Sequence, residues 1–305
     1  MPTIKLKDRI KKGLFLLDGA MGTQLIARGI TAGKCISFLN IESPQVVLDI
    51  QSSYIRAGSD AVITNTFGAN RYALARYKLN GEMARINKSG AEIARRAAGR
   101  DKYVLGNIGP SGEFLEPIGT LKEAELKQAF IEQAEALSAG GVDGFIIETM
   151  TALDEITVAI DAVKLVTGTL PVFASMAFDR VKDGFRTSMG VDVSSAVSAI
   201  IEKGVDAAGF NCGRIPVGEY EKLAVEYCAL AKALGEGVAV FAEPNAGEPE
   251  LRSGKTVYSL LPEDFAAEMQ VVYQAGVHII GGCCGTGPEH IKAIAELLKA
   301  KEKHF

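Results

Sequence analysis

Eight short apolar segments recur along the chain, and stretches with helical periodicity separate them. Within each segment the apolar residues follow one another almost without interruption, which is typical of parallel strands that are buried on both faces. The segments span residues 13–17, 60–64, 103–106, 144–147, 171–176, 207–210, 238–242 and 277–280. Amphipathic helix patterns lie between them, for example at 44–57, 121–139 and 194–203. The chain is therefore predicted to repeat a strand–helix unit.

Eight strand–helix units in 305 residues predict an α/β fold of the (β/α)₈ TIM barrel type. An open doubly wound sheet is the alternative that the pattern leaves open. No Pro- or Ser-rich linker and no low-complexity tract interrupts the sequence, so a single domain over residues 1–305 is expected. In a (β/α)₈ barrel the active site lies at the carboxyl ends of the strands. The residues that follow the apolar segments are therefore the candidates for chemistry.

The composition argues against several classes of protein. The chain is 48% hydrophobic and 23% charged, as in an ordinary globular protein, and its net charge of −4 disfavours a nucleic-acid partner. No apolar run reaches the ~18–20 residues that a membrane span needs, and the first residues lack the apolar core of a signal peptide. We therefore expect no membrane partner and a cytoplasmic location. The five cysteines are then expected to be reduced thiols.

Three of these cysteines follow two different apolar segments. Cys212 comes after the sixth segment, and Cys283 and Cys284 come after the eighth, within Gly-Gly-Cys-Cys-Gly. Three thiolates that converge on one point are typical ligands of Zn²⁺, and they leave its fourth position open. An open position of this kind suits a substrate thiol that is to be held as thiolate. The sequence thus predicts a zinc site with Cys212, Cys283 and Cys284 as both metal ligands and catalytic residues.

Other interpretations of the cysteines stay open. A buried cysteine can simply pack as a small hydrophobic residue, which is how we interpret Cys35 and Cys228. The glycine-rich turn after the last strand is also a common phosphate site in barrels, because a helix start near Thr286 follows it. That site would fit a lyase or isomerase that acts on a phosphorylated substrate, but it would leave the three thiols without a role.

Polar residues end several other segments. Asp18 precedes a turn at 19–22 whose backbone N–H groups can face an anion, and Glu148 ends the fourth segment. The two carboxylates and these N–H groups would bind a zwitterionic amino acid at its ammonium and carboxylate ends. For Asp18 a role as a helix N-cap is the alternative. Asn65 and Asn245 also end segments, and bonding to the turn backbone is the alternative role for both.

These motifs together resemble the homocysteine S-methyltransferase family. The resemblance runs from about residue 10 to residue 300. Its motifs are Asp18-Gly19-Ala20-Met21-Gly22-Thr23, Thr64-Asn65-Thr66-Phe67-Gly68, Asn211-Cys212 and Gly281-Gly282-Cys283-Cys284-Gly285-Thr286. Stretches 109–113, 243–247 and 254–258 are most similar to the homocysteine-binding barrel of cobalamin-dependent methionine synthase.

The resemblance implies a zinc-dependent methyltransferase with a (β/α)₈ fold, which activates L-homocysteine as a zinc-bound thiolate and methylates it to methionine. It implies Zn²⁺ on the three cysteines, with Asn245 as a weak fourth ligand that the substrate displaces. The residues expected to hold homocysteine are Asp18, Gly19, Ala20, Met21, Asn65 and Glu148.

The methyl donor is less defined. Cobalamin-dependent methionine synthases continue into folate, cobalamin and reactivation modules, and none follows in these 305 residues. A methylcorrinoid such as methylcobalamin, carried by a separate protein or domain, is therefore the expected donor. S-methylmethionine or betaine is the alternative donor. The interpretation that the chain is an excised fragment of a longer protein also stays open. A non-catalytic module that presents homocysteine or zinc to a partner subunit is the remaining rival.

Overall fold

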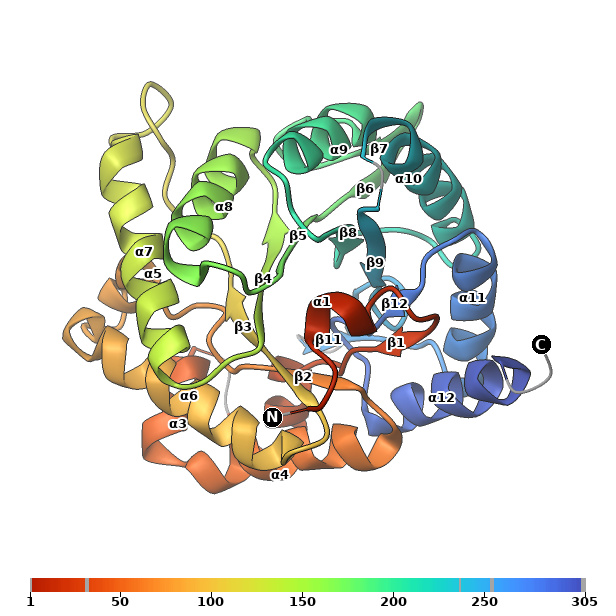
Figure 1. Ribbon diagram of the computed structural model, residues 1–305, viewed down its shortest axis with the longest axis horizontal. Coiled ribbons are helices and arrows are strands. Elements are labelled where there is room, and N and C mark those ends of the chain that lie inside the picture. The colour runs from red at the N-terminus through yellow and green to blue at the C-terminus, as the bar shows by residue number, and fades with distance from the viewer. Residues whose placement is uncertain (1, 31–32, 236, 253–254, 303–305) are drawn as a thin grey trace.

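Eight parallel strands line a central barrel, and helices surround it (Figure 1). The computed structural model describes residues 2–30, 33–235, 237–252 and 255–302, so Gly254 of the 254–258 motif lies outside the described residues. The barrel strands are β1 (Phe15–Leu16), β2 (Ala61–Ile63), β3 (Tyr103–Ile108), β4 (Gly144–Met150), β5 (Val172–Met176), β8 (Ala207–Asn211), β9 (Ala239–Glu243) and β12 (Ile279–Ile280). Their order in the sheet is β1-β12-β9-β8-β5-β4-β3-β2.

Contacts between β1 and β2 bring the two ends of this sheet together. The backbone N–H of Asp60 donates to the carbonyl oxygen of Leu16 at 2.6 Å. In return, the carboxylate of Asp60 accepts from the N–H of Leu16 at 3.0 Å. The sheet is thus a nearly closed barrel, which confirms the predicted (β/α)₈ fold and excludes the open doubly wound sheet.

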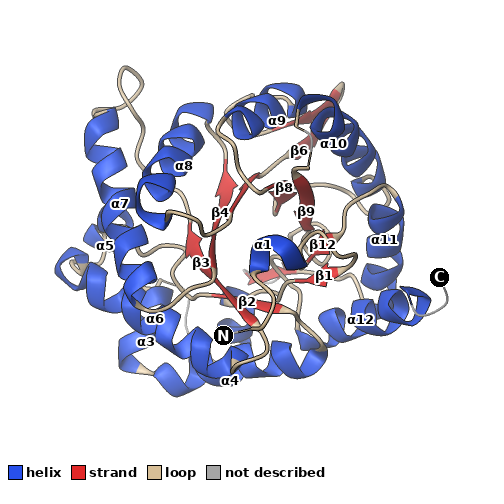
Figure 2. Cartoon of the chain, viewed as in Figure 1, coloured by secondary structure: helices blue, strands red, loops and turns tan. Residues whose placement is uncertain are grey.

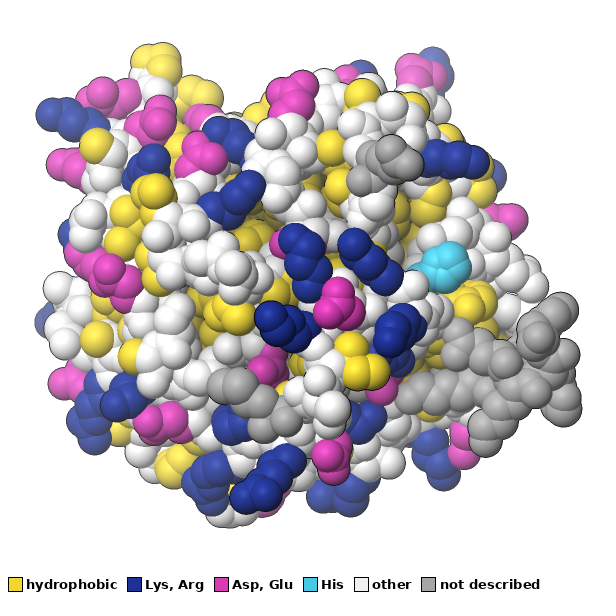
Figure 3. Space-filling view, in the orientation of Figure 1, with side chains coloured by type: hydrophobic (Ala, Val, Ile, Leu, Met, Phe, Trp, Pro, Cys, Tyr) yellow, Lys and Arg dark blue, Asp and Glu magenta, His cyan; other side chains and the backbone are white. Residues whose placement is uncertain are grey.

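Large apolar side chains fill the barrel interior. Phe15, Phe173 and Phe241 belong to one buried cluster there, together with residues from the other strands. The short helix α1 (Leu6–Arg9) adds Leu6 to the same cluster and so closes the amino end of the barrel. Figure 3 shows this face, where lysine and arginine side chains gather around the middle. The carboxyl ends of the strands, where a site is expected, lie at the opposite end.

A second and larger buried layer separates the strands from the outer helices (Figure 2). The helices are α2 (Gly22–Ala27), α3 (Leu39–Glu42), α4 (Pro44–Ala57), α5 (Arg71–Ala75), α6 (Met83–Ala98), α7 (Glu123–Ala139), α8 (Leu153–Thr167), α9 (Val193–Glu202), α10 (Tyr220–Leu234), α11 (Pro262–Gln274) and α12 (Pro288–Glu302), with 3₁₀ turns η1 (Ile36–Phe38) and η2 (Asn80–Glu82). Within the described residues, no helix combines the length and the apolar character that a membrane crossing requires.

Two antiparallel hairpins extend beyond the barrel. They pair β6 (Asp179–Val181) with β7 (Gly184–Arg186) and β10 (Glu250–Arg252) with β11 (Lys255–Val257). The sequence does not predict these hairpins. The predicted end of the fourth strand at residue 147 is also too early, because β4 continues to Met150 and therefore contains Glu148.

Candidate metal centre and active site

The sulfur atoms of Cys212, Cys283 and Cys284 all lie within 4.8 Å of one another, and we call these residues the cysteine cluster. Cys212 directly follows β8, and the pair follows β12 after two glycines. Zinc bound tetrahedrally at about 2.3 Å would hold its sulfur ligands about 3.8 Å apart. Small side-chain adjustments would bring the cluster to that spacing, so the residues present fit a zinc ion.

The backbone at Cys212 turns sharply to bring its thiol to this point. Cys212 has a φ of 54°, and Gly213 follows with a φ of 73°, so both lie in the left-handed region. A Cβ atom on residue 213 would overlap the carbonyl oxygen of Phe178. Glycine at 213 is therefore required for the turn that re-aims Cys212.

The end of β9 connects the two parts of the cysteine cluster. The N–H of Cys212 donates to the carbonyl oxygen of Glu243 at 3.1 Å, and the N–H of Cys283 donates to that of Pro244 at 2.7 Å. The side chain of Asn245 accepts from the N–H of Cys284 at 3.0 Å and donates to the carbonyl oxygen of Gly213 at 2.8 Å. Residues 243–245 thus hold both cysteine-bearing loops in one relative position.

The three thiols differ in acidity because they hydrogen-bond to one another. Bonds from Cys212 and Cys283 lower the pKa of the Cys284 thiol to about 3. A hydrogen bond with Cys283 lowers the pKa of Cys212, but its bond to Cys284, burial and repulsion outweigh this and raise that pKa to about 12. The hydrogen bond with Cys212 contributes most to raising the pKa of Cys283. A nearby divalent cation would let all three thiols lose their protons.

A cavity of about 580 Å³ opens beside the cysteine cluster and is lined by all three cysteines. The lining includes every residue predicted to hold homocysteine: Asp18, Gly19, Ala20, Met21, Asn65 and Glu148. Cys35 also lines it, besides packing against a small apolar cluster as predicted. Cys228 packs half-buried against the main core, as predicted.

Two asparagines hold the carboxylate of Glu148 in the cavity wall. Asn107 donates to its Oε1 at 2.6 Å, and Asn211 donates to its Oε2 at 3.1 Å. Asn211 also lies 4.0 Å from the sulfur of Cys283, so it contacts both the carboxylate and the cysteine cluster. Removal of the Glu148 carboxylate from water raises its pKa to about 7. The role of both asparagines is not predicted from the sequence, although each directly follows an apolar segment.

The turn after β1 is attached to the loop that carries Cys283 and Cys284. The N–H of Ala20 donates to the hydroxyl of Thr286 at 3.1 Å, and Tyr54 donates to the carbonyl oxygen of Ala20 at 2.7 Å. A side chain on residue 19 would collide with both Thr286 and Tyr54. These contacts are not predicted from the sequence, and they leave the N–H of Ala20 engaged within the protein.

Asp18 and Asn65 contact neighbouring backbone as well as the cavity. The buried carboxylate of Asp18 accepts from the N–H of Ile63 at 3.0 Å, and burial raises its pKa well above the usual range. The amide of Asn65 donates to the carbonyl oxygen of Ile36 at 2.9 Å and to the side chain of Asn40 at 3.1 Å. Asn65 thus fixes the segment that forms one side of the cavity mouth.

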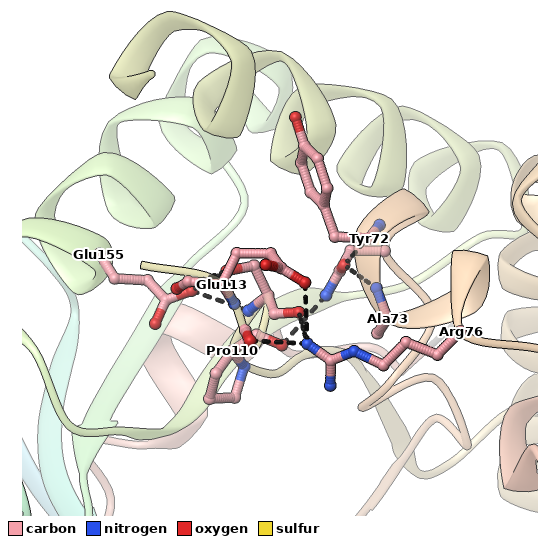
Figure 4. A network of polar contacts seen from close by, with 9 residues as sticks. Tyr72, Ala73, Arg76, Pro110, Glu113 and Glu155 are labelled. Carbon is pink, nitrogen blue, oxygen red and sulfur yellow. Dashed lines mark hydrogen bonds and ion pairs between the residues drawn. The ribbon is translucent and has the colours of Figure 1, made fainter. Parts of the chain in front are cut away.

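A polar network holds the outer wall of the cavity (Figure 4). The guanidinium of Arg76, which follows α5, donates to the carbonyl oxygen of Gly112 at 2.6 Å and pairs with Glu113 at 3.1 Å. On the other side of this loop, Glu155 of α8 accepts from the N–H of Ser111 at 2.7 Å. The loop after β3 is therefore fixed between α5 and α8.

Comparison with known proteins gives a consistent assignment. The family model described as Homocysteine S-methyltransferase matches residues 15–298. A methionine synthase of Mycobacterium tuberculosis is 33% identical over 307 residues, which cover 95% of this chain and 25% of that protein. A methionine synthase of Mycobacterium leprae is 31% identical with the same coverage. The chain thus spans about a quarter of the length of the curated relatives it matches.

Solved structures show the same fold. The metallated form of the homocysteine methyltransferase MmuM from Escherichia coli superposes with a TM-score of 0.76 at 23% identity. The match covers 96% of this chain and 99% of that one. The oxidized form of the same enzyme gives a TM-score of 0.75 at 24% identity, with 97% and 98% coverage. With a family model that matches most of its length, the chain belongs to the homocysteine S-methyltransferase family.

Proposed function

We propose that the chain is a zinc-dependent enzyme that methylates the sulfur of L-homocysteine and so forms methionine. One observation carries this proposal: the three sulfurs of the cysteine cluster converge at the wall of a cavity that also contains Asp18 and Glu148. Membership of the homocysteine S-methyltransferase family supports the same substrate.

Cys212, Cys283 and Cys284 would hold the zinc ion. When bound, Zn²⁺ lowers the pKa of a coordinated thiol and so supplies a thiolate at neutral pH, where a free thiol is only a few per cent ionised. Asn245 is the proposed weak fourth ligand, and its side-chain oxygen, which accepts a hydrogen bond from the N–H of Cys284 at 3.0 Å, already contacts the loop that carries two of the cysteines.

The other residues of the cavity position the substrate. We assign the α-ammonium group to the carboxylates of Asp18 and Glu148, and the α-carboxylate to backbone N–H groups of the turn at Gly19 and Met21. Ala20 shapes this turn, because both its backbone groups are bonded to Thr286 and Tyr54. Asn65 holds the neighbouring wall. Fixed in this way, the substrate sulfur needs little further reorientation before attack on the methyl group.

A methylcorrinoid, carried by a separate protein or domain, is the proposed methyl donor, because the chain matches only 25% of a methionine synthase and the rest of that protein leaves room for other domains. S-methylmethionine or betaine is the alternative donor, and a cavity of about 580 Å³ leaves space for a small molecule beside the amino acid. Retention of three reduced thiols favours a cytoplasmic location.

An assay of methionine formation from L-homocysteine tests the proposal, with methylcobalamin, S-methylmethionine and betaine supplied in parallel to zinc-loaded protein. About one zinc per chain and methionine with one of the donors are expected. Near-zero zinc would instead favour an enzyme that acts on a phosphorylated substrate. Homocysteine binding without transfer from any donor would favour a non-catalytic module.

A further inference from the structure

The carboxylate of Glu243 is buried, and one of its oxygens has no partner in the described part of the chain. Glu243 is the last residue of β9 and is only 2% exposed. Its Oε2 atom accepts no hydrogen bond from the residues that the structure describes. The residue nevertheless lines the cavity beside the cysteine cluster. Burying a carboxylate oxygen without a partner costs free energy, so a fold-stabilising role does not explain it.

The charged groups that act on Glu243 are also carboxylates. Glu148 and Asp18 both raise its pKa by repulsion, in addition to the larger effect of burial. We call these three residues the carboxylate triad. Among the described residues, no lysine or arginine appears among the main influences on any member of the triad. The triad is thus a group of three acids whose charged forms lack a stabilising cation from the described residues.

A neighbouring amide adds to the set of acceptors. Asn107 is 6% exposed and lines the same cavity, and its donor side holds Glu148. Its carbonyl oxygen Oδ1 is buried and has no partner within the described part of the chain. Two orphaned acceptors beside three carboxylates match a ligand group that carries positive charge and several N–H donors. An ammonium group has three such donors and no acceptor.

We propose that Glu243 is a third carboxylate of the amino-acid site, and that it binds the α-ammonium group of the substrate together with Asp18 and Glu148. This inference rests on the proposed function, in which the substrate is an amino acid with a thiol. By binding the ammonium group, Glu243 makes the site prefer homocysteine over thiols of the same length that lack the amino group. The orphaned oxygen is then satisfied only when substrate is present.

Glu243→Gln tests this role, because it keeps the shape of the side chain and removes its charge. Binding to the zinc-loaded protein is measured by calorimetry for L-homocysteine and for 4-mercaptobutanoate, which is homocysteine without its amino group. Thermal unfolding without substrate and zinc content are measured in parallel. Glu268→Gln is the matched control, since Glu268 is a buried glutamate of α11 at 9% exposure, bonded to the N–H of Gly218 at 2.8 Å.

We expect Glu243→Gln to weaken homocysteine binding by about tenfold or more, the factor for loss of one charge-assisted hydrogen bond. Binding of 4-mercaptobutanoate should stay within about twofold or improve, because an anionic repulsion is removed. Zinc content should be unchanged, and the unfolding midpoint without substrate should be equal or higher. Glu268→Gln should leave both affinities unchanged.

Other results overturn the inference. Unchanged homocysteine affinity, equal weakening of both ligands, loss of zinc, a lower unfolding midpoint or failure to fold would each show that Glu243 acts elsewhere or supports the fold. Failure of the proposed function looks different, because the unmutated protein itself would then neither bind nor methylate homocysteine.

Discussion

The hydroxyl oxygen of Thr286 lies 3.1 Å from the backbone nitrogen of Ala20. The same hydroxyl donates to the carbonyl oxygen of Cys283 at 2.7 Å. One side chain therefore joins the turn proposed to hold the amino acid to the loop proposed to hold the metal. The positions of the two sites relative to each other depend on this contact.

Thr286→Val should disturb both sites, because valine keeps the shape of threonine but leaves the N–H of Ala20 without a partner. We expect a loss of ~1–3 kcal/mol in the free energy of unfolding and an increase of about tenfold in KM for homocysteine. Denaturant titration and steady-state kinetics check this. Thr286→Ser, which keeps the hydroxyl, should have a free energy of unfolding and a KM for homocysteine close to those of the unmutated protein. A Thr286→Val variant with an unchanged free energy of unfolding and an unchanged KM would show that the two hydrogen bonds of the hydroxyl do not matter.

Cys284→Ala should abolish stoichiometric zinc, because two thiolates hold the ion far less tightly than three. Turnover should then fall by at least about thirtyfold, since an unassisted thiol is only a few per cent ionised at neutral pH. Zinc content by mass spectrometry and methionine formation are the measurements. Cys228→Ala is the control, because Cys228 packs against the core on α10. Activity that persists in a metal-free variant would reject the mechanism.

Glu148→Ala should raise KM for homocysteine by about 10- to 100-fold, the effect of losing one charge-assisted bond to the ammonium group. The zinc content should stay near one per chain, because Glu148 bonds to Asn107 and Asn211 and is not a member of the cysteine cluster. Kinetics and metal analysis on the same preparation test both statements. Loss of zinc would show that Glu148 is misassigned.

The stability of metal-free protein should depend on pH through Glu148. Its pKa rises from 4.5 to about 7 on folding, mainly because of burial. The folded state thus favours the protonated form, and the stability from this group is full below about pH 4.5 and lost as the pH rises through about 7. Denaturant titrations of the unmutated protein and Glu148→Gln at about pH 5 and pH 8 measure this. Between about pH 5 and pH 8, the free energy of unfolding of the unmutated protein should fall relative to that of Glu148→Gln. If the difference between the two proteins is the same at both pH values, the raised pKa of Glu148 is contradicted.

The fold follows from the sequence because strands buried on both faces leave continuous apolar runs. The convergence of Cys212 with Cys283 follows as well, since parallel strands bring their carboxyl ends together. The hairpin β10–β11 escapes prediction because the described residues of β10 are exposed, and exposed strands lack the apolar runs that mark the barrel strands.

Contacts between residues that lie far apart along the chain could not be predicted from the sequence. Asn211 contacts Glu148, which lies far away along the chain, and no local pattern indicates that pairing. Thr286 appears in the sequence as a helix start, although its hydroxyl bonds to Ala20. Glu243 shows the same signal as Glu148, an acid at the end of an apolar run, but only the fold reveals that its Oε2 atom lacks a partner among the described residues.

Within the described residues, helix α1 and the aromatic side chains inside the barrel close its amino end, so the cavity beside the cysteine cluster opens toward the loops that follow the strands. Phe15, Phe173 and Phe241 block passage along the axis, and Leu6 seals the far end. The proposed amino acid, methyl donor and product would therefore all pass through the mouth between the loops that follow the strands. If the methyl donor is a carrier protein, as proposed, it would cover that mouth, so homocysteine would have to enter before the donor docks and methionine would leave after the donor departs.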